Sequence, residues 1–253
     1  MTNFKNKTVL ITGGSRGIGK ATALAFAVQG ASVGINFKSN QKAAEETLAQ
    51  LSGKGHQLFQ FDISDQDSQK GLVEDFISTY GQIDVLVNNA GISIEHDIEE
   101  VDFKDWSSAF QNTFQTNLFA AANLSFLVAK HMMKNRGGHI VNVSSRGAFR
   151  GEPTKPAYGA SKAALNAMSQ SLAKKLAPHN IYVGVVAPGF TETDMATKTL
   201  TPVERENLLR ESPFKRMAQP KEVAHAILFL ASEGAAYSSG SIIDVNGASY
   251  LRS

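Results

Sequence analysis

Tyr158 and Lys162, in the segment YGASK, are the residues whose types and spacing most directly suggest chemistry. Side chains four positions apart lie on one face of a helix, so the phenol and the ammonium would be neighbours. A phenol titrates at about 10, which is high for a proton donor at neutral pH, and we expect a nearby ammonium to lower that pKa. Tyr158 would then exchange a proton with a carbonyl oxygen as hydride arrives or leaves. A half-buried tyrosine beside a surface lysine would show the same pattern, which alone carries little information.

Two adjacent serines, Ser144 and Ser145, follow the strand-like run GHIVNV and precede Tyr158. A hydroxyl at this place could donate a hydrogen bond to a substrate carbonyl and to the alkoxide that forms from it. Adjacent residues of an extended chain point to opposite sides, so we expect only one of the two serines to face the site.

A glycine-rich turn lies near the start of the chain, in TVLITGGSRGIGKATALAFAVQG. Gly13, Gly17 and Gly19 follow a strand-like run, and a helical pattern begins at about Gly17. Glycines let a pyrophosphate approach the backbone at a helix N-terminus, where the N–H groups and the helix dipole favour negative charge. The spacing is not G-x-G-x-x-G, so the position between strand and helix supports a dinucleotide site more than the motif does.

The second predicted strand ends in NFKSN, where a carboxylate is absent. In a Rossmann unit that binds NAD, an acidic residue about twenty positions after the glycines accepts a hydrogen bond from the ribose 2′-hydroxyl. Residues 36–40 contain Asn36, Lys38 and Ser39 instead, and Arg16 stands in the glycine turn. Cations at these places suit a 2′-phosphate and predict NADP(H). The alternative is that Lys38 is an ordinary solvated lysine.

Short β-branched runs alternate with segments of helical period along the whole chain. The alternation predicts right-handed βαβ crossovers and one α/β domain over 1–253, a Rossmann-type doubly wound seven-stranded parallel sheet. The strands are expected at 7–11, 31–37, 56–61, 83–88, 138–144, 181–187 and 241–246. The helices are expected at 17–29, 40–53, 65–80, 105–135, 158–177 and 220–232. Residues 188–219 interrupt the alternation, which favours a functional lid at about 190–215 over a plain surface insertion.

Composition excludes several classes of function. The 253 residues are 42% hydrophobic and 19% charged, as in a folded protein, and the formal net charge of +2 gives no reason to expect nucleic-acid binding. No cysteine is present, and the six histidines have no ligand spacing, so we expect no metal. No apolar run is long enough for a membrane span and no leader is visible, so we expect a cytoplasmic protein.

The motifs together resemble the short-chain dehydrogenase/reductase family, and among its members the 3-oxoacyl-acyl-carrier-protein reductases most. They are TGGSRGIG, NNAG at 88–91, VSS at 143–145, YGASK at 158–162 and PGFTETDM at 188–195. The resemblance implies an NADPH-dependent enzyme that reduces a ketone, such as a 3-oxoacyl thioester, to a secondary alcohol. Other small carbonyl, alcohol or sugar substrates, or a catalytically silent NADP-binding regulator, remain as alternatives.

The resemblance also implies roles for individual residues. The catalytic set would be Asn117, Ser145, Tyr158 and Lys162, with Ser145 selected over Ser144 by its distance from the tyrosine and Asn117 anchoring a water for a proton relay. Asp62 and Ile63 would contact adenine, although Asp62 could simply cap a turn. The cofactor-binding set would be Gly13, Ser15, Arg16, Gly17, Ile18, Gly19, Asn36, Lys38, Ser39, Asp62, Ile63, Asn88, Ala90, Gly91, Tyr158, Lys162, Pro188, Gly189, Thr191 and Thr193.

Substrate and partner recognition are the least specified features. Residues 146–157 should form one wall of the substrate pocket, where Arg146 and Arg150 either receive an anionic substrate or are solvated arginines. Carrier-protein reductases use two arginines near the mouth of the site, and the corresponding positions hold Arg136 and His179.

The family resemblance implies a homotetramer, or a dimer. The helices at 105–135 and 158–177 would pack against a partner. Candidate contacts are Phe110, Phe114, Leu118 and Leu165, although burial inside one subunit would select the same residue types.

Overall fold

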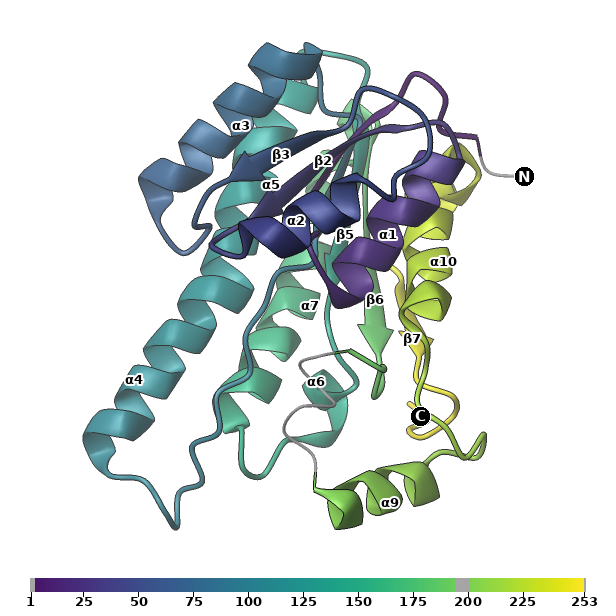
Figure 1. Ribbon diagram of the computed structural model, residues 1–253. Coiled ribbons are helices and arrows are strands. Elements are labelled where there is room, and N and C mark those ends of the chain that lie inside the picture. Colours follow the sequence, from purple (N-terminus) through teal and green to yellow (C-terminus); the bar gives the residue numbers. More distant parts are fainter. Residues whose placement is uncertain (1–2, 194–200, 253) are drawn as a thin grey trace.

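The computed structural model describes residues 3–193 and 201–252. Its centre is one parallel sheet with strand order β3-β2-β1-β4-β5-β6-β7 (Figure 1). The strands are β1 (Thr8–Ile11), β2 (Ser32–Phe37), β3 (Gln57–Gln60), β4 (Val85–Asn88), β5 (Gly138–Val143), β6 (Ile181–Pro188) and β7 (Ile242–Val245). Seven strands were predicted, each within two residues of these bounds, and the Rossmann-type fold is confirmed.

Helices cover both faces of the sheet. They are α1 (Gly17–Val28), α2 (Gln41–Leu48), α3 (Gln66–Tyr80), α4 (Phe103–Phe114), α5 (Ala120–Met132), α6 (Gly147–Arg150), α7 (Pro156–Leu176), α9 (Pro202–Glu211) and α10 (Pro220–Leu230). A π-helical segment, Gln115–Phe119, joins α4 to α5, so the single helix expected at 105–135 is divided.

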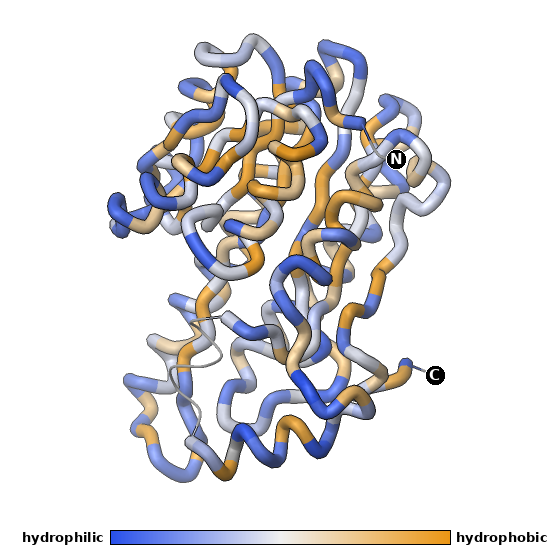
Figure 2. Tube along the Cα trace, turned by 45° about the vertical axis from the view of Figure 1, so that its right-hand side comes forward, coloured by the Kyte–Doolittle hydropathy of each residue, from blue (hydrophilic) through white to orange (hydrophobic). Residues whose placement is uncertain are grey.

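Two hydrophobic cores form, one on each face of the sheet. Along β1, Val9 and Ile11 pack with α1 and α10, whereas Leu10 packs on the other face with α3, α5 and α7. Strands buried on both faces must be apolar throughout, which explains runs such as TVLI and the hydrophobic centre in Figure 2.

The segment expected at 188–219 to lack a strand is only partly irregular. Its described residues include α9 and an isolated bridge between Thr191 and Ala218. The predicted lid at about 190–215 includes residues 194–200, which lie outside the described residues, so the lid stays a prediction.

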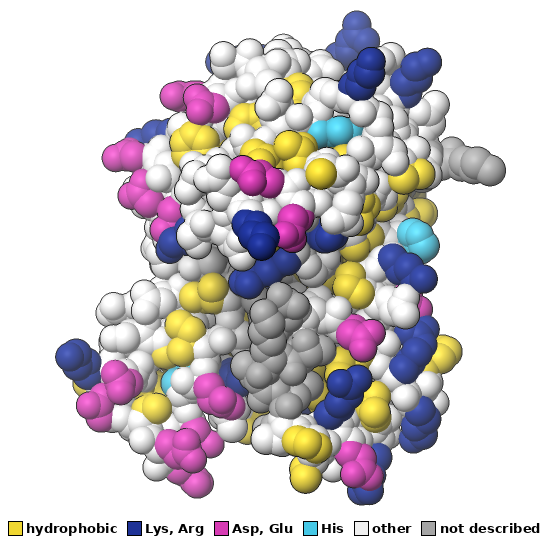
Figure 3. Space-filling model, in the orientation of Figure 1, with side chains coloured by type: hydrophobic (Ala, Val, Ile, Leu, Met, Phe, Trp, Pro, Cys, Tyr) yellow, Lys and Arg dark blue, Asp and Glu magenta, His cyan; other side chains and the backbone are white. Residues whose placement is uncertain are grey.

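The surface carries charges of both signs. On the face in Figure 3, lysine and arginine side chains alternate with aspartate and glutamate and form no extended basic patch. Within the described ranges, no helix combines the length and apolar character needed to cross a membrane.

Parallel strands bring all their carboxyl ends to one edge of the sheet. The chain reverses direction across the sheet between β1 and β4, which are neighbours although β2 and β3 lie between them in sequence. Ligands of such folds bind outside the carboxyl ends at this point. The glycine turn follows β1, the NNAG segment ends β4, and Ser145 follows β5, so these motifs meet at the same edge.

Candidate active site

Lys162 is almost fully buried. Its side chain comes from the second turn of α7 and is 4% exposed, and Nζ donates a hydrogen bond of 2.8 Å to the carbonyl of Val143 at the end of β5. Burial lowers the pKa of Lys162 to about 8. Nζ lies 5.9 Å from the centre of the Tyr158 ring, so the helix places the two groups side by side as expected.

Tyr158 differs from its expected protonation behaviour. Burial raises the pKa of Tyr158 above the ordinary 10.0; hydrogen bonding with Ser145 opposes this rise and the Glu152 carboxylate adds to it. The pKa of Tyr158 is therefore raised rather than lowered as expected, because burial of the phenol outweighs the hydrogen bond with Ser145. At neutral pH Tyr158 is a protonated phenol, suited to donating a proton.

The two serines have separate partners. Ser144 is buried and donates from Oγ to the carbonyl of Lys162 at 3.2 Å, which ties the end of β5 to α7. Ser145 Oγ accepts a hydrogen bond of 3.0 Å from the N–H of Gly147 and interacts with Tyr158. The structure thus brings Ser145, Tyr158 and Lys162 together and places Ser144 against the helix behind them.

Asn117 connects the NNAG segment to α7. It lies in the π-helical segment, a rare irregularity that is common near functional sites. Its Oδ1 accepts from the N–H of Ile92 at 2.8 Å, while Nδ2 donates to the Ile92 carbonyl at 2.9 Å and to Ser161 Oγ at 3.1 Å. A Cβ added to Gly91 would lie 3.2 Å from Asn117 Oδ1 and 3.4 Å from Lys162 Nζ, so Gly91 lies close to both groups.

The glycine turn has the features of a phosphate cradle. Gly13 and Gly17 have φ of 63° and 55°, a region that favours glycine. Arg16 precedes the first turn of α1 without capping it by its side chain, and no acidic residue occupies that turn. A helix N-terminus with these properties attracts an anion. Cβ atoms added to Gly13 and Gly17 would lie 3.0 Å from the Ala90 Cα and 3.1 Å from Thr193 Cγ2, which shows how closely other segments approach the turn.

Two residues that support this cradle were not predicted from the sequence. Asn89 donates from Nδ2 to the carbonyls of Thr12 and Gly13 at 2.9 and 3.1 Å. Thr12 Oγ1 accepts from the N–H groups of Asn89 and Ala90 at 3.0 and 3.1 Å. The predicted Asn88 instead points into the core, where Nδ2 donates to Asn142 Oδ1 at 2.8 Å. The strand alternation that ends β4 could have indicated which asparagine faces the turn.

The residues predicted around the 2′-position have mixed roles. Lys38 Nζ forms a 2.6 Å ion pair with Asp62, so it is neither an isolated phosphate ligand nor simply solvated. Burial opposes ionisation of Asp62, but hydrogen bonds from Lys38 and Ser64 outweigh it and hold its pKa below 3.8. Arg16 and Ser39 are exposed, whereas Asn36 is buried and donates to the carbonyls of Phe59 and Phe61. The Asn36 side chain therefore joins β2 to the β3 region.

The remaining predicted cofactor residues are distributed between loop and core. Ile63 belongs to the core beneath β3, and the Ser15 carbonyl accepts from Thr47 Oγ1 at 2.9 Å. At the end of β6, the N–H of Gly189 donates to the Val245 carbonyl at 3.0 Å, and buried Thr191 donates from Oγ1 to the Gly189 carbonyl at 3.2 Å. From Pro188 the chain thus crosses toward the glycine turn, where Thr193 approaches Gly17.

Arg146 differs from both roles expected for it, an anion receptor and a solvated arginine. It is 3% exposed and donates to Glu211 Oε2 on α9 at 2.7 Å and to Ser249 Oγ at 2.6 Å; Arg150 donates to the same Glu211 oxygen at 2.8 Å. The guanidinium also lies 4.7 Å from the centre of the Phe190 ring. Neither an anion receptor nor a solvated arginine describes this residue, because an internal carboxylate already pairs with it.

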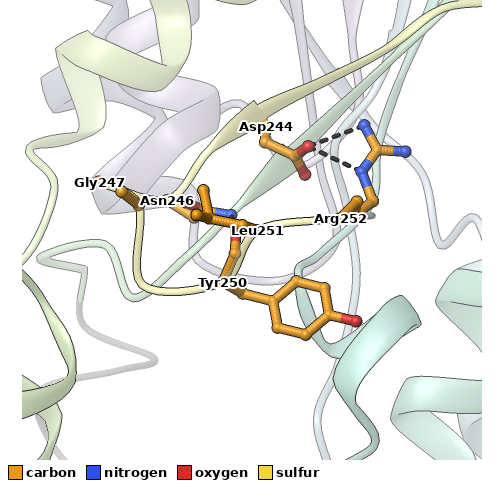
Figure 4. Close-up of a pocket in the computed structure, with 7 residues that line it drawn as sticks. Asp244, Asn246, Gly247, Tyr250, Leu251 and Arg252 are labelled. Atoms are coloured by element: carbon orange, nitrogen blue, oxygen red, sulfur yellow. Dashed lines mark hydrogen bonds and ion pairs between the residues drawn. The ribbon is translucent and has the colours of Figure 1, made fainter.

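The C-terminal segment supports the other side of α6. Figure 4 shows Arg252 paired with Asp244, and Tyr250 extending away from that pair. Arg252 lies over the Phe149 ring at 4.5 Å, and the Tyr250 hydroxyl donates to the Phe149 carbonyl at 3.3 Å. The short helix after Ser145 is therefore held between α9 and the end of the chain.

The positions expected to recognise a carrier protein lie elsewhere. Arg136 and His179 are exposed and precede β5 and β6, at the amino ends of these strands. Ser145 follows the carboxyl end of β5, about 20 Å away along a six-residue strand. Within one chain they are not at the mouth of the site. Among the described residues, no group of three or more His, Asp or Glu side chains could hold a metal ion.

Comparison with known proteins places these features in a family. The family model for short chain dehydrogenases matches residues 7–203. The 3-oxoacyl-[acyl-carrier-protein] reductase of Thermotoga maritima is 41% identical over 246 residues, 96% of this chain and 98% of the relative, and that of Chlamydia trachomatis is 40% identical over 245 residues, 96% of each. A solved structure described as a short-chain alcohol dehydrogenase from Sinorhizobium meliloti has a TM-score of 0.91 at 30% identity, covering 98% of this chain and 97% of that one. The chain therefore belongs to the short-chain dehydrogenase/reductase family of nicotinamide-dependent oxidoreductases that act on carbonyl and alcohol groups.

Proposed function

We propose that the protein is an NADPH-dependent reductase that converts a 3-oxoacyl thioester to the corresponding secondary alcohol. One observation carries the catalytic part: a phenol whose pKa is raised lies against Ser145 and beside a buried ammonium at the carboxyl end of β5. A proton donor of this kind suits reduction of a ketone, since the developing alkoxide must receive a proton.

Each residue of the proposed catalytic set has a separate role in ketone reduction. Ser145 donates a hydrogen bond to the substrate carbonyl and stabilises the negative charge that develops there. Tyr158 gives its proton to that oxygen, and the Lys162 ammonium stabilises the phenolate left behind. Bound NADPH supplies the hydride. Asn117 links the backbone of Ile92 to Ser161 on α7, and we propose a water-mediated proton supply through Lys162 as its further role.

The residues present fit a nicotinamide dinucleotide, and two cations favour the phosphorylated form. The glycine cradle and the uncapped N-terminus of α1 would hold the pyrophosphate, while Arg16 and Lys38 would approach a 2′-phosphate. Asp62 would then share Lys38 with the phosphate and contact adenine. We place Ala90 and Gly91 beside the adenosine ribose and residues 188–193 against the nicotinamide.

The thioester part of the proposal comes from the reductases that are 40–41% identical to this chain. Arg136 and His179 at the far edge of the sheet give no support for carrier recognition within one chain. A reductase or dehydrogenase of another small carbonyl or alcohol is therefore the second candidate. A catalytically silent regulator is disfavoured, because it would have no use for Ser145 arranged against a protonated Tyr158.

The test is the loss of NADPH absorbance with acetoacetyl-coenzyme A, carrier-bound acetoacetate and a panel of small ketones. We expect turnover with at least one thioester, and Tyr158→Phe should abolish it while leaving NADPH binding nearly unchanged, because the ring stays and only the proton donor is lost. Similar rates with both thioesters would argue against a dedicated carrier-protein substrate. No rate with either would refute the thioester assignment, and an active Tyr158→Phe variant would refute the mechanism.

A further inference from the structure

His96 is a buried histidine between the NNAG segment and α7, with 1% of its surface exposed. Its Nδ1 lies 2.9 Å from the carbonyl of Ile94, and its Nε2 lies 3.2 Å from the N–H of Ala157. A carbonyl can only accept and an N–H can only donate, so both bonds require one neutral tautomer with the proton on Nδ1. Nε2 is therefore an acceptor directed at the first turn of α7.

That acceptor satisfies a backbone donor that α7 leaves open. Lys155 precedes the helix without a side-chain capping bond, and Pro156, the first helical residue, has no N–H. Ala157 is the second helical residue, whose N–H normally needs a capping acceptor. His96 supplies this acceptor from a distant segment, and Tyr158 is the next residue of the helix.

The histidine is itself held on all sides. The backbone N–H of His96 donates to the Thr154 carbonyl at 2.9 Å. Its ring packs edge-on against Trp106 and Phe110 of α4, with ring centres 5.3 and 5.5 Å away. Asn117 fixes the same segment four residues earlier, through both backbone groups of Ile92. The connection from β4 to α4 thus passes the start of α7 and is held there by the contacts of Ile92 and His96 (Figure 1).

We propose that His96 is a positioning residue for catalysis, which caps the first turn of α7 and thereby sets the place of the Tyr158 hydroxyl relative to Ser145. The proposal rests on the proposed function, because it takes Tyr158 as the proton donor. Lys162 lies one turn further along and has its own anchors, the Val143 carbonyl for Nζ and Ser144 Oγ for its carbonyl. Losing the cap should therefore displace Tyr158 and leave Lys162 and the cofactor cradle in place.

Three substitutions separate capping from packing. His96→Gln extends an amide oxygen to about the place of Nε2 and can still accept from Ala157. His96→Asn is shorter by one methylene, so its amide reaches Ile94 but falls short of Ala157. His96→Phe keeps an aromatic ring between Trp106 and Phe110 and removes both bonds. The Gln and Asn variants form the matched pair, because they differ only in reach.

The experiment measures kcat, KM, the NADPH dissociation constant and Tm of the four proteins, with Tyr158→Phe in the same assay. We expect kcat to fall about tenfold or more in the Asn and Phe variants, with KM and NADPH binding within about twofold of native, because a displacement of about 1 Å can reduce catalysis this strongly. The Gln variant should recover most of the difference. Native kcat in the Asn and Phe variants, or a Gln variant no faster than the Asn variant, would overturn the role of His96. Activity in Tyr158→Phe would instead overturn the proposed function.

Discussion

Burial favours the uncharged form of both Tyr158 and Lys162, so it raises the pKa of the phenol and lowers the pKa of the ammonium. For the phenol this means that the proton is held to higher pH than usual. For the lysine it means that the ammonium is present below a pH of about 8 and is lost above it. The pair is therefore best suited to proton donation at neutral pH. As the pH rises, Lys162 loses its proton before Tyr158 does.

A pH profile tests this order. We expect kcat/KM for ketone reduction to decrease as the pH rises through about 8, where Lys162 loses its proton, while Tyr158 stays protonated. Lys162→Arg should lower the rate at neutral pH but remove the decrease between about pH 7 and 9, because a guanidinium keeps its charge there. A native profile that stays level to about pH 10 would contradict the assignment.

Lys38 and Arg16 give a second prediction at the level of single residues. Charge-assisted bonds contribute about 1.5–3 kcal/mol each, so the two cations together should favour NADPH over NADH about a hundredfold or more. The double variant Arg16→Ala/Lys38→Ala should lose most of this preference in kcat/KM. Lys54→Ala, an exposed lysine that precedes β3 at the opposite edge of the sheet, is the control. If the double variant kept the native preference for NADPH over NADH, Lys38 would have no role in cofactor selection beyond its ion pair with Asp62.

At the scale of elements, Glu211 links α9 to α6. It accepts from both Arg146 and Arg150, and Arg146 is almost fully buried. Burial raises the pKa of Glu211, but the hydrogen bonds from the two arginines outweigh it and hold the value below 4.5. A carboxyl whose pKa is lower in the folded state stabilises the fold above its ordinary pKa, and this contribution is lost as the pH falls below about 4.5.

The substitution Glu211→Gln tests this link. We expect it to lower the free energy of unfolding by about 1–2 kcal/mol at neutral pH, a value reduced for the partial exposure of the carboxylate. The difference from native should shrink as the pH falls below about 4.5. Glu206→Gln on the same helix removes an exposed ion pair with Arg210 and should change stability by less than about 0.5 kcal/mol. If the two substitutions lowered the free energy of unfolding in urea equally, burial of Arg146 would add nothing to the stability of its ion pair with Glu211.

Elements with a periodic pattern could be predicted from the sequence, and contacts between elements could not. The strands were found because parallel strands are apolar along their whole length, as in the TVLI run of β1. The π-helical segment around Asn117 was not predicted, because a single inserted residue shifts the apolar pattern by only one position. The pairing of Arg146 with Glu211 joins residues 65 positions apart, and the cap from His96 to Ala157 joins residues 61 apart. Both depend on packing that composition and spacing do not encode.

For the whole molecule, the exposed apolar side chains bear on assembly. Leu165, one of the residues predicted to contact a partner, is 1% exposed inside its own chain and is not available for that contact. Phe119, Phe126 and Met133 are instead 49%, 62% and 36% exposed. They are spaced by seven residues along α5 and its ends, so they lie on one face of the helix.

An exposed apolar stripe of this length is typical of a surface that another molecule covers. We expect a second copy of the chain to pack against it, in agreement with the homotetramer or dimer that the sequence predicted. Light scattering at micromolar concentration should then give a multiple of 27.2 kDa. Phe126→Asp should shift the protein toward the monomer, because a carboxylate in the centre of an apolar interface loses its water without gaining a partner. Val203→Asp, at a 68% exposed position in the first turn of α9, is the control and should leave the assembly unchanged. A native particle of single-chain mass, or equal effects of the two substitutions, would exclude α5 as the contact between copies.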